Sequence, residues 1–106
     1  MTRPVFFLPE AEAELLEGRA WYDARAIGLG DRFFLAIDAL VARIGEAPRQ
    51  FPEVHGATHR ALVRHFPYAL FFRIEPEGVY VIACMHTSRN PKRWIRRALP
   101  HSAIGS

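Results

Sequence analysis

Hydrophobic residues gather in the second half of the chain, in three short runs separated by turn-forming residues. Residues 69–74 and 79–85 are rich in Phe, Val, Ile and Tyr and contain neither Gly nor Pro, a composition typical of β-strands. Between them lies Glu75-Pro76-Glu77-Gly78, in which the proline fixes its own φ and the glycine adopts a positive φ at little cost. With a further run at 59–65, joined through Phe66-Pro67-Tyr68, this pattern predicts a three-stranded antiparallel meander.

Both faces of this meander are expected to be apolar. In the run 69–74, Leu70 and Phe72 would face one side and Phe71 the other, and the run 79–85 is apolar in the same way. An antiparallel sheet with one solvated face would alternate apolar and polar residues, so both faces must be covered. One cover is expected from helices upstream. The other is either the C-terminal segment folding back or a partner chain, and the shortness of that segment, about ten residues, favours a partner.

The first half of the chain predicts a short strand and a helical hairpin. Residues 5–8 form an apolar stretch that ends at Pro9 and is expected as an edge strand beside the meander. Residues 10–26 have the three-and-four spacing of an amphipathic helix, with acidic residues in the first turn. A second helix is predicted from Asp31, as its N-cap, to the residues before Pro48. Gly28-Leu29-Gly30 is too short for a phosphate loop and is interpreted as the turn between the helices.

The predicted fold is therefore α+β: an N-terminal edge strand, a helical hairpin, a three-stranded antiparallel meander and a short basic C-terminal segment. Its core is expected to include Trp21, Phe34 and Phe72, at each of which alanine would cost about 3–5 kcal/mol. The only cysteine, Cys84, falls within a predicted strand and is expected to be a small core residue.

The length of 106 residues suits one domain, spanning 1–106, with a disordered tail at 101–106. No apolar run is long enough to cross a bilayer, and the N-terminus lacks the pattern of a signal peptide. We therefore expect a cytoplasmic protein.

Charge is distributed unevenly along the chain. Residues 1–50 hold six Arg against eight Asp and Glu, whereas residues 51–106 hold seven Arg and one Lys against three Glu. The densest basic stretch, 86–97, has no acidic residue and contains Arg89, Lys92, Arg93, Arg96 and Arg97. Such a stretch favours a polyanion or an acidic protein surface as partner. The alternative is a solvated tail in a chain that uses Arg in place of Lys.

The residues that could carry chemistry lie in the same basic half. Arg60 and Arg64 are four residues apart on the predicted strand 59–65 and would share a face, Arg73 lies on the neighbouring strand, and His86 and Arg89 follow the last strand. His and Arg can act as base, acid and cation in the cleavage of RNA through its own 2′-hydroxyl. They can also bind a phosphate or a carboxylate without any chemistry.

A metal site is not expected. His55 and His59 have the spacing of half a zinc site, but no cysteine pair or nearby carboxylate completes it. No dinucleotide fingerprint or Ser/His/Asp order is present either, so no cofactor is expected.

Motifs along nearly the whole chain resemble the RelE/ParE superfamily of toxins from bacterial type II toxin–antitoxin modules. The matching residues are Glu14-Leu15 with Glu17, Trp21-Tyr22, Gly28-Leu29-Gly30-Asp31-Arg32-Phe33, Pro48, Phe51-Pro52, Arg60, Phe66-Pro67-Tyr68, His86, Arg89, Pro91 and Trp94. The resemblance implies a compact α+β fold with a helical hairpin packed on a small antiparallel sheet. It also implies an antitoxin that wraps the toxin and links it to operator DNA.

Within the superfamily the chain looks more like the ParE branch, whose characterised members bind DNA gyrase. Ribonuclease members tend to carry basic residues at two positions that here hold Leu62 and Ala69, and a tyrosine or similar group near the position of Trp94. The resemblance therefore implies growth inhibition by gyrase binding. The alternatives are ribosome-dependent mRNA cleavage, as in RelE, and a degenerate toxin that only assists its antitoxin in repressing their operon.

This interpretation assigns roles to particular residues. The residues expected to contact a target or nucleic acid are Arg60, Arg64, Arg73, Arg89, Arg93 and Trp94. If the protein were a nuclease, His86 and Arg89 would be its catalytic residues. The antitoxin is expected to contribute an acidic, partly disordered segment that covers the sheet face or the helical hairpin.

Overall fold

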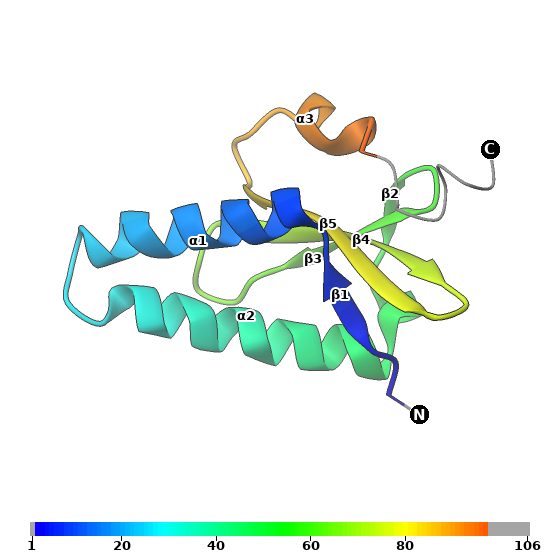
Figure 1. Ribbon diagram of the computed structural model, residues 1–106, viewed down its shortest axis with the longest axis horizontal. Helices are drawn as coiled ribbons and strands as arrows, with labels where there is room; N and C mark the ends of the chain where they lie inside the picture. Colours follow the sequence, from blue (N-terminus) through cyan, green and yellow to red (C-terminus); the bar gives the residue numbers. More distant parts are fainter. Residues whose placement is uncertain (1, 98–106) are drawn as a thin grey trace.

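The computed structural model describes residues 2–97 and shows an α+β fold in which a helical hairpin packs against a five-stranded sheet (Figure 1). The sheet order is β1-β5-β4-β3-β2, with β1 parallel to β5 and the other pairs antiparallel. The elements in chain order are β1 (Val5–Phe7), α1 (Pro9–Asp23), α2 (Leu29–Glu46), the 3-10 helix η1 (Pro48–Gln50), β2 (Glu53–His55), β3 (Thr58–Leu62), β4 (Tyr68–Glu75), β5 (Gly78–His86) and α3 (Lys92–Ile95). The predicted fold class is confirmed. The tail expected at 101–106 lies outside the described residues.

The junction between α1 and α2 differs from the sequence prediction. α1 ends at Asp23, short of residue 26, and α2 begins two residues before Asp31, which therefore is not its N-cap. Gly28 occupies the N-cap position with a φ of 81°, a left-handed conformation that glycine adopts without a Cβ clash. The free N–H of Gly30 donates across the turn to Asp23 Oδ1 at 2.9 Å. The capping carboxylate thus comes from the end of the preceding helix. It lies seven positions before Gly30, so the residues next to the start of α2 do not predict it.

The sheet differs from the predicted meander at one edge. β3 ends at Leu62, so residues 63–65 lie outside the strand, and His65 turns the chain with a φ of 69°. β2 is an additional antiparallel strand that the predicted three-stranded meander does not include. All three residues of β2 are exposed, so no apolar alternation marks the strand and only its pairing with β3 defines it. β1 occupies an edge of the sheet beside β5, as expected.

The helical hairpin covers one face of the sheet. The α2 stripe Phe33, Ile37, Leu40 and Ile44 is at most 3% exposed and belongs to the same core cluster as the sheet residues Leu70, Phe72, Val79 and Val81. At the end of this core near the hairpin turn, the rings of Tyr22, Phe33, Phe66 and Tyr68 contact one another. α2 is the longest helix, and none of the helices within residues 2–97 is both long and apolar enough to cross a membrane.

The predicted core residues have three different outcomes. Phe72 is fully buried, which confirms the prediction, and Phe34 is partly buried. Trp21 is 50% exposed, so its assignment to the core was wrong. Its ring lies against the edge of Tyr22 and under the guanidinium of Arg25, 4.0 Å from the ring centroid. The spacing of α1 explains the error, because two adjacent aromatic residues on a helix cannot both face the sheet.

The C-terminal segment covers the second face of the sheet. α3 lies on the opposite side of the strands from α2 (Figure 1), and Trp94 stacks on Phe71 with ring centroids 4.5 Å apart. Trp94 is only 2% exposed and packs with Ile82, Ala83 and Met85. The segment therefore folds back over the sheet, and the preference for a partner chain at this face was wrong. The buried indole of Trp94 anchors this helix of four residues on the sheet.

Candidate functional site

A pocket of about 620 Å³ opens between α1 and the end of β5. Its walls are formed by α1, by Tyr68 at the start of β4, by the last residues of β5, and by the segment that leads into α3. The lining side chains include Glu14, Glu17, Trp21, Tyr68, Cys84, His86, Ser88, Arg89 and Arg93. This α1–β5 pocket therefore contains the two residues proposed as catalytic, His86 and Arg89, together with Arg93.

The floor of the α1–β5 pocket lies along a strand edge that β1 does not cover. β1 pairs with β5 only as far as Phe7 and Val81, so the following residues of β5 face α1 with backbone groups that need other partners. The Glu14 carboxylate accepts a hydrogen bond from Cys84 N–H at 3.0 Å. The Ile82 carbonyl accepts one from Arg97 Nη1 at 2.7 Å. The side chains of Glu14 and Arg97 thus form the hydrogen bonds to the β5 backbone that a neighbouring strand would otherwise form.

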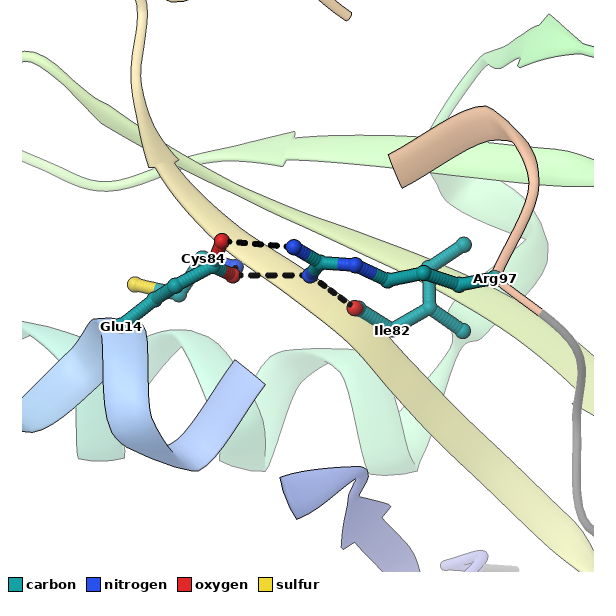
Figure 2. A network of polar contacts seen from close by, with 4 residues as sticks. All are labelled: Glu14, Ile82, Cys84 and Arg97. Atoms are coloured by element: carbon teal, nitrogen blue, oxygen red, sulfur yellow. Dashed lines mark hydrogen bonds and ion pairs between the residues drawn. The ribbon is translucent and has the colours of Figure 1, made fainter. Parts of the chain in front are cut away.

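Glu14 and Arg97 are joined to each other by a two-pronged ion pair. Arg97 donates from Nη1 to Glu14 Oε1 at 2.9 Å and from Nη2 to Oε2 at 2.8 Å (Figure 2). Both side chains are less than one-fifth exposed. The hydrogen bonds to Glu14 raise the pKa of Arg97 above its ordinary value, so the guanidinium remains charged. The pair fixes the end of the basic segment that carries Arg89 and Arg93.

His86 lines the pocket, and its Nδ1 is engaged by Ser88. Its Nδ1 accepts a hydrogen bond from Ser88 N–H at 3.1 Å and lies 2.8 Å from Ser88 Oγ. A neutral imidazole that accepts at Nδ1 carries its proton at Nε2. Nε2 therefore has an N–H to donate, and a general base at Nε2 would require the other tautomer, in which the proton is on Nδ1. Donation suits the recognition of an anionic group beside Arg89 and Arg93.

The thiol and the phenol of the pocket, those of Cys84 and Tyr68, favour their neutral forms. Burial, and secondarily the nearby Glu14, raises the pKa of Cys84 to about 12, so the thiol is protonated near neutral pH. Burial is also the main cause that raises the pKa of Tyr68. A nucleophile is normally activated by a lowered pKa, which neither group has. The expectation that Cys84 is a small core residue is confirmed, because it is 2% exposed.

The predicted group of basic residues is divided among three places. Arg60 lies opposite Phe71 and Arg73 opposite Tyr80, so both point to the sheet face that α3 covers. Arg64 follows the end of β3 and lines a different hollow, against α2. The expectation that Arg60 and Arg64 share a strand face was wrong because β3 ends before Arg64. The α1–β5 pocket brings together His86, Arg89 and Arg93.

Trp94 is placed as a core residue. Its indole Nε1 is buried and has no hydrogen-bond partner within residues 2–97. The same holds for Nε of Arg73. Trp94 would therefore affect target binding indirectly, by stacking on Phe71 and so fixing the position of the basic segment that carries Arg89 and Arg93.

The two histidines considered for zinc have structural surroundings. His59 stacks on Phe72, donates from Nδ1 to the Phe51 carbonyl at 2.7 Å, and lies 3.9 Å from Glu53. His55 approaches the ring of Trp94. Within residues 2–97, no group of three or more His, Cys, Asp or Glu side chains is placed to hold a metal ion.

Several residues in or beside the pocket were not predicted as site residues, among them Glu14, Glu17, Trp21 and Arg97. For the first three the sequence did carry a signal, because they are among the residues that resemble the RelE/ParE superfamily. Arg97 was noted only as part of a basic stretch. Its pairing with Glu14 spans 83 positions and leaves no local pattern.

Comparisons with known proteins show the family and the fold. The family model described as "ParE toxin of type II toxin-antitoxin system, parDE" matches residues 5–91. The chain is 29% identical over 92 residues to Toxin ParE2 of Mycobacterium tuberculosis, in the CDC 1551 / Oshkosh and H37Rv strains alike, covering 86% of this chain and 88% of the relative. Among solved structures, a chain from the chromosomal ParDE TA system of P. aeruginosa superimposes with a TM-score of 0.69 over 80% of this chain and 96% of that chain. At 14% identity, this last similarity shows that the fold is shared.

Proposed function

Because the chain belongs to the ParE toxin family of type II toxin–antitoxin systems, we propose that it inhibits growth by binding DNA gyrase through the surface around the α1–β5 pocket. The observation that supports this is the convergence of three donors, His86, Arg89 and Arg93, on one pocket whose thiol and phenol are not activated for chemistry. A set of donors without an activated nucleophile suits binding more than bond cleavage.

The pocket also has the features of a protein-binding surface. Arg89 and Arg93 are exposed, and neither forms an ion pair with a carboxylate within residues 2–97. Trp21 presents a half-exposed indole at the wall. Arg and Trp are the residue types in which binding energy at protein interfaces concentrates. An acidic patch on the target would complement these cations.

Messenger RNA cleavage on the ribosome is the second candidate function. The supporting observation is that His86, Arg89 and Tyr68 line the same pocket, with the His86 and Tyr68 rings 5.5 Å apart. An imidazole, a guanidinium and a phenol can provide an acid, a cation and a second proton donor for phosphoryl transfer. In that case replacing His86 would reduce the cleavage rate roughly a hundred-fold or more while ribosome binding remained.

A cognate antitoxin completes the proposal. Membership of the family implies an antitoxin partner. We expect that partner to neutralise the toxin and to provide any contact with operator DNA. Gyrase and ribosomes are both cytoplasmic, so the proposal places the protein in the cytoplasm.

The test adds purified protein to two reactions, gyrase supercoiling of plasmid DNA and a translating ribosome programmed with a defined mRNA. Inhibited supercoiling with intact message is the expected result. Message cleavage with normal supercoiling would overturn it in favour of the nuclease. If folded protein affects neither reaction, the degenerate toxin is favoured, and its effect on the binding of the antitoxin to operator DNA is then measured.

A further inference from the structure

The α1–β5 pocket has walls of opposite charge. The wall formed by α1 carries Glu17, and the wall formed by the segment after β5 carries Arg89 and Arg93. All three side chains are exposed, and none of them forms an ion pair within residues 2–97. The proposed contact with an acidic target uses the cations alone, so it leaves the carboxylate of Glu17 without a role.

The two charges act on one group of the pocket, the phenol of Tyr68. Burial is the main cause that raises the pKa of this phenol, and among the smaller causes Arg89 lowers the pKa and Glu17 raises it. The guanidinium and the carboxylate therefore lie within electrostatic range of the same hydroxyl. A ligand in this space meets an anion acceptor and a hydrogen-bond acceptor at once.

Trp21 adds a flat apolar surface to the pocket. Its indole lines the pocket and is 50% exposed, although the guanidinium of Arg25 lies over the ring, 4.0 Å from the centroid. The volume of about 620 Å³ is within the range of about 300–1,000 Å³ that is usual for small-molecule pockets. An open indole in such a pocket suits a planar ligand, because nucleobases stack on aromatic side chains.

We propose that the α1–β5 pocket binds a guanine nucleotide. The base lies on Trp21 and donates hydrogen bonds from its Watson–Crick edge to Glu17. The phosphate accepts hydrogen bonds from Arg89 and Arg93, whose planar guanidinium groups match it in charge and geometry. Guanine is the base that fits, because its N1–H and N2–H lie side by side and match the two oxygens of a carboxylate. Adenine and cytosine each present an acceptor nitrogen at this edge, which a carboxylate repels.

Glu17 is the carboxylate assigned to the base because Glu14, the other one in the pocket, is already engaged. Both oxygens of Glu14 accept hydrogen bonds from Arg97. Glu12 provides a matched control, since it is exposed on the same helix and does not line the pocket. The inference does not depend on gyrase. It shares Arg89 and Arg93 with the gyrase proposal, so a bound nucleotide and an acidic target would exclude each other.

The test measures ligand binding to the full chain by isothermal titration calorimetry. The ligands are the 5′-monophosphates of guanosine, inosine and adenosine (GMP, IMP and AMP), guanosine itself and inorganic phosphate. We expect GMP to bind most tightly, because IMP lacks the 2-amino group, AMP lacks both donors and guanosine lacks the phosphate. Each loss should raise Kd by about tenfold or more. The trinucleotide pGUU identifies the source of the nucleotide: tighter binding than GMP assigns the group to the end of an RNA, and equal or weaker binding assigns it to a free nucleotide.

Variants of the chain separate the two ends of the ligand, with circular dichroism as the check on folding. Glu17→Gln should raise the Kd of GMP by about tenfold and leave that of inorganic phosphate unchanged, whereas Arg93→Ala should weaken both. Glu12→Gln should bind GMP like the unmodified chain. Stacking should also quench the fluorescence of Trp21, and this quenching should be absent in Trp21→Phe because the remaining Trp94 is only 2% exposed.

Three outcomes would overturn the proposal: neither GMP nor pGUU binds the folded protein, AMP binds as tightly as GMP, or Glu12→Gln weakens binding as much as Glu17→Gln. Failure of the gyrase proposal leaves this result unaffected, because the calorimetric assay contains no gyrase. Failure of nucleotide binding likewise leaves the gyrase proposal standing, since inhibition of supercoiling is measured separately.

Discussion

Glu14 and Arg97, 83 positions apart, form a two-pronged ion pair on the stretch of β5 that β1 leaves uncovered. The same two side chains satisfy Cys84 N–H and the Ile82 carbonyl (Figure 2). The pair therefore replaces strand pairing at this edge, and it ties the segment after α3 to α1.

Breaking this pair should lower the free energy of unfolding. Arg97→Ala leaves a mostly buried carboxylate and a strand carbonyl without their donor, and we expect a loss of about 2–3 kcal/mol in urea denaturation. Arg19→Ala is the matched control, because its ion pair with Asp31 is solvent-exposed and should contribute below about 1 kcal/mol. Equal losses in the two variants would contradict the structural role of the pair.

The two tryptophans should respond differently to substitution. Trp94→Ala removes a ring that is 2% exposed, and we expect a loss of about 3–5 kcal/mol, as for the buried Phe72. Trp21→Ala removes a half-exposed ring and should cost below about 1 kcal/mol. Thermal or urea unfolding measures both. A loss of several kcal/mol in the free energy of unfolding of Trp21→Ala would show that Trp21 is a core residue after all.

The start of α2 should depend on Asp23 more than on Asp31. Asp23→Ala removes the acceptor for Gly30 N–H, and we expect a loss of about 1–2 kcal/mol. Asp31→Ala removes only the exposed pair with Arg19 and should cost about 0.5 kcal/mol. The reverse order in equilibrium unfolding would show that Asp31 is the cap after all.

Alkaline pH should destabilise the fold through Cys84. An unfolded thiol titrates near pH 9.0, whereas burial raises the pKa of Cys84 to about 12 in the folded chain. Since the folded state retains this proton longer, the contribution of the thiol is full below pH 9 and is lost as the pH rises toward 12. The maximum slope is about 1.4 kcal/mol per pH unit.

Cys84→Ala isolates this contribution. Urea midpoints measured from pH 8 to pH 11 should fall less steeply in the variant, with a residual slope from Tyr22 and Tyr68, whose pKa values burial also raises. If the urea midpoint fell with pH equally steeply in both proteins, the Cys84 thiol would be more exposed to solvent than it is in the structure.

Target binding should be distributed over the basic segment. Arg89→Ala and Arg93→Ala each remove a cation from the α1–β5 pocket, and each should weaken inhibition of supercoiling by roughly tenfold. Arg96→Ala is the control, since Arg96 is exposed on the same segment and does not line the pocket. An equal effect of all three would indicate an unspecific contribution of charge.

The sequence by itself determined the type and order of the main elements, β1, α1, α2, β3, β4 and β5. The β-branched and aromatic composition of β4 and β5, the α2 stripe and the turn at Pro76 and Gly78 are local patterns, and the structure contains the elements they predict. The apolar character of both sheet faces also required two covering layers, which are present. Local patterns are reliable here because strand and helix periodicity is set by the backbone.

Only the tertiary structure decided which groups meet. It placed Trp94 over Phe71, separated Arg64 from Arg60, and replaced the expected N-cap of α2 with Asp23. Above all, it brought Glu14 to Arg97 at the uncovered part of β5, where unpaired backbone groups inside the fold need partners from distant parts of the chain. The reason is physical: burial and hydrogen-bond satisfaction depend on the folded surroundings, which short-range patterns in a sequence do not contain.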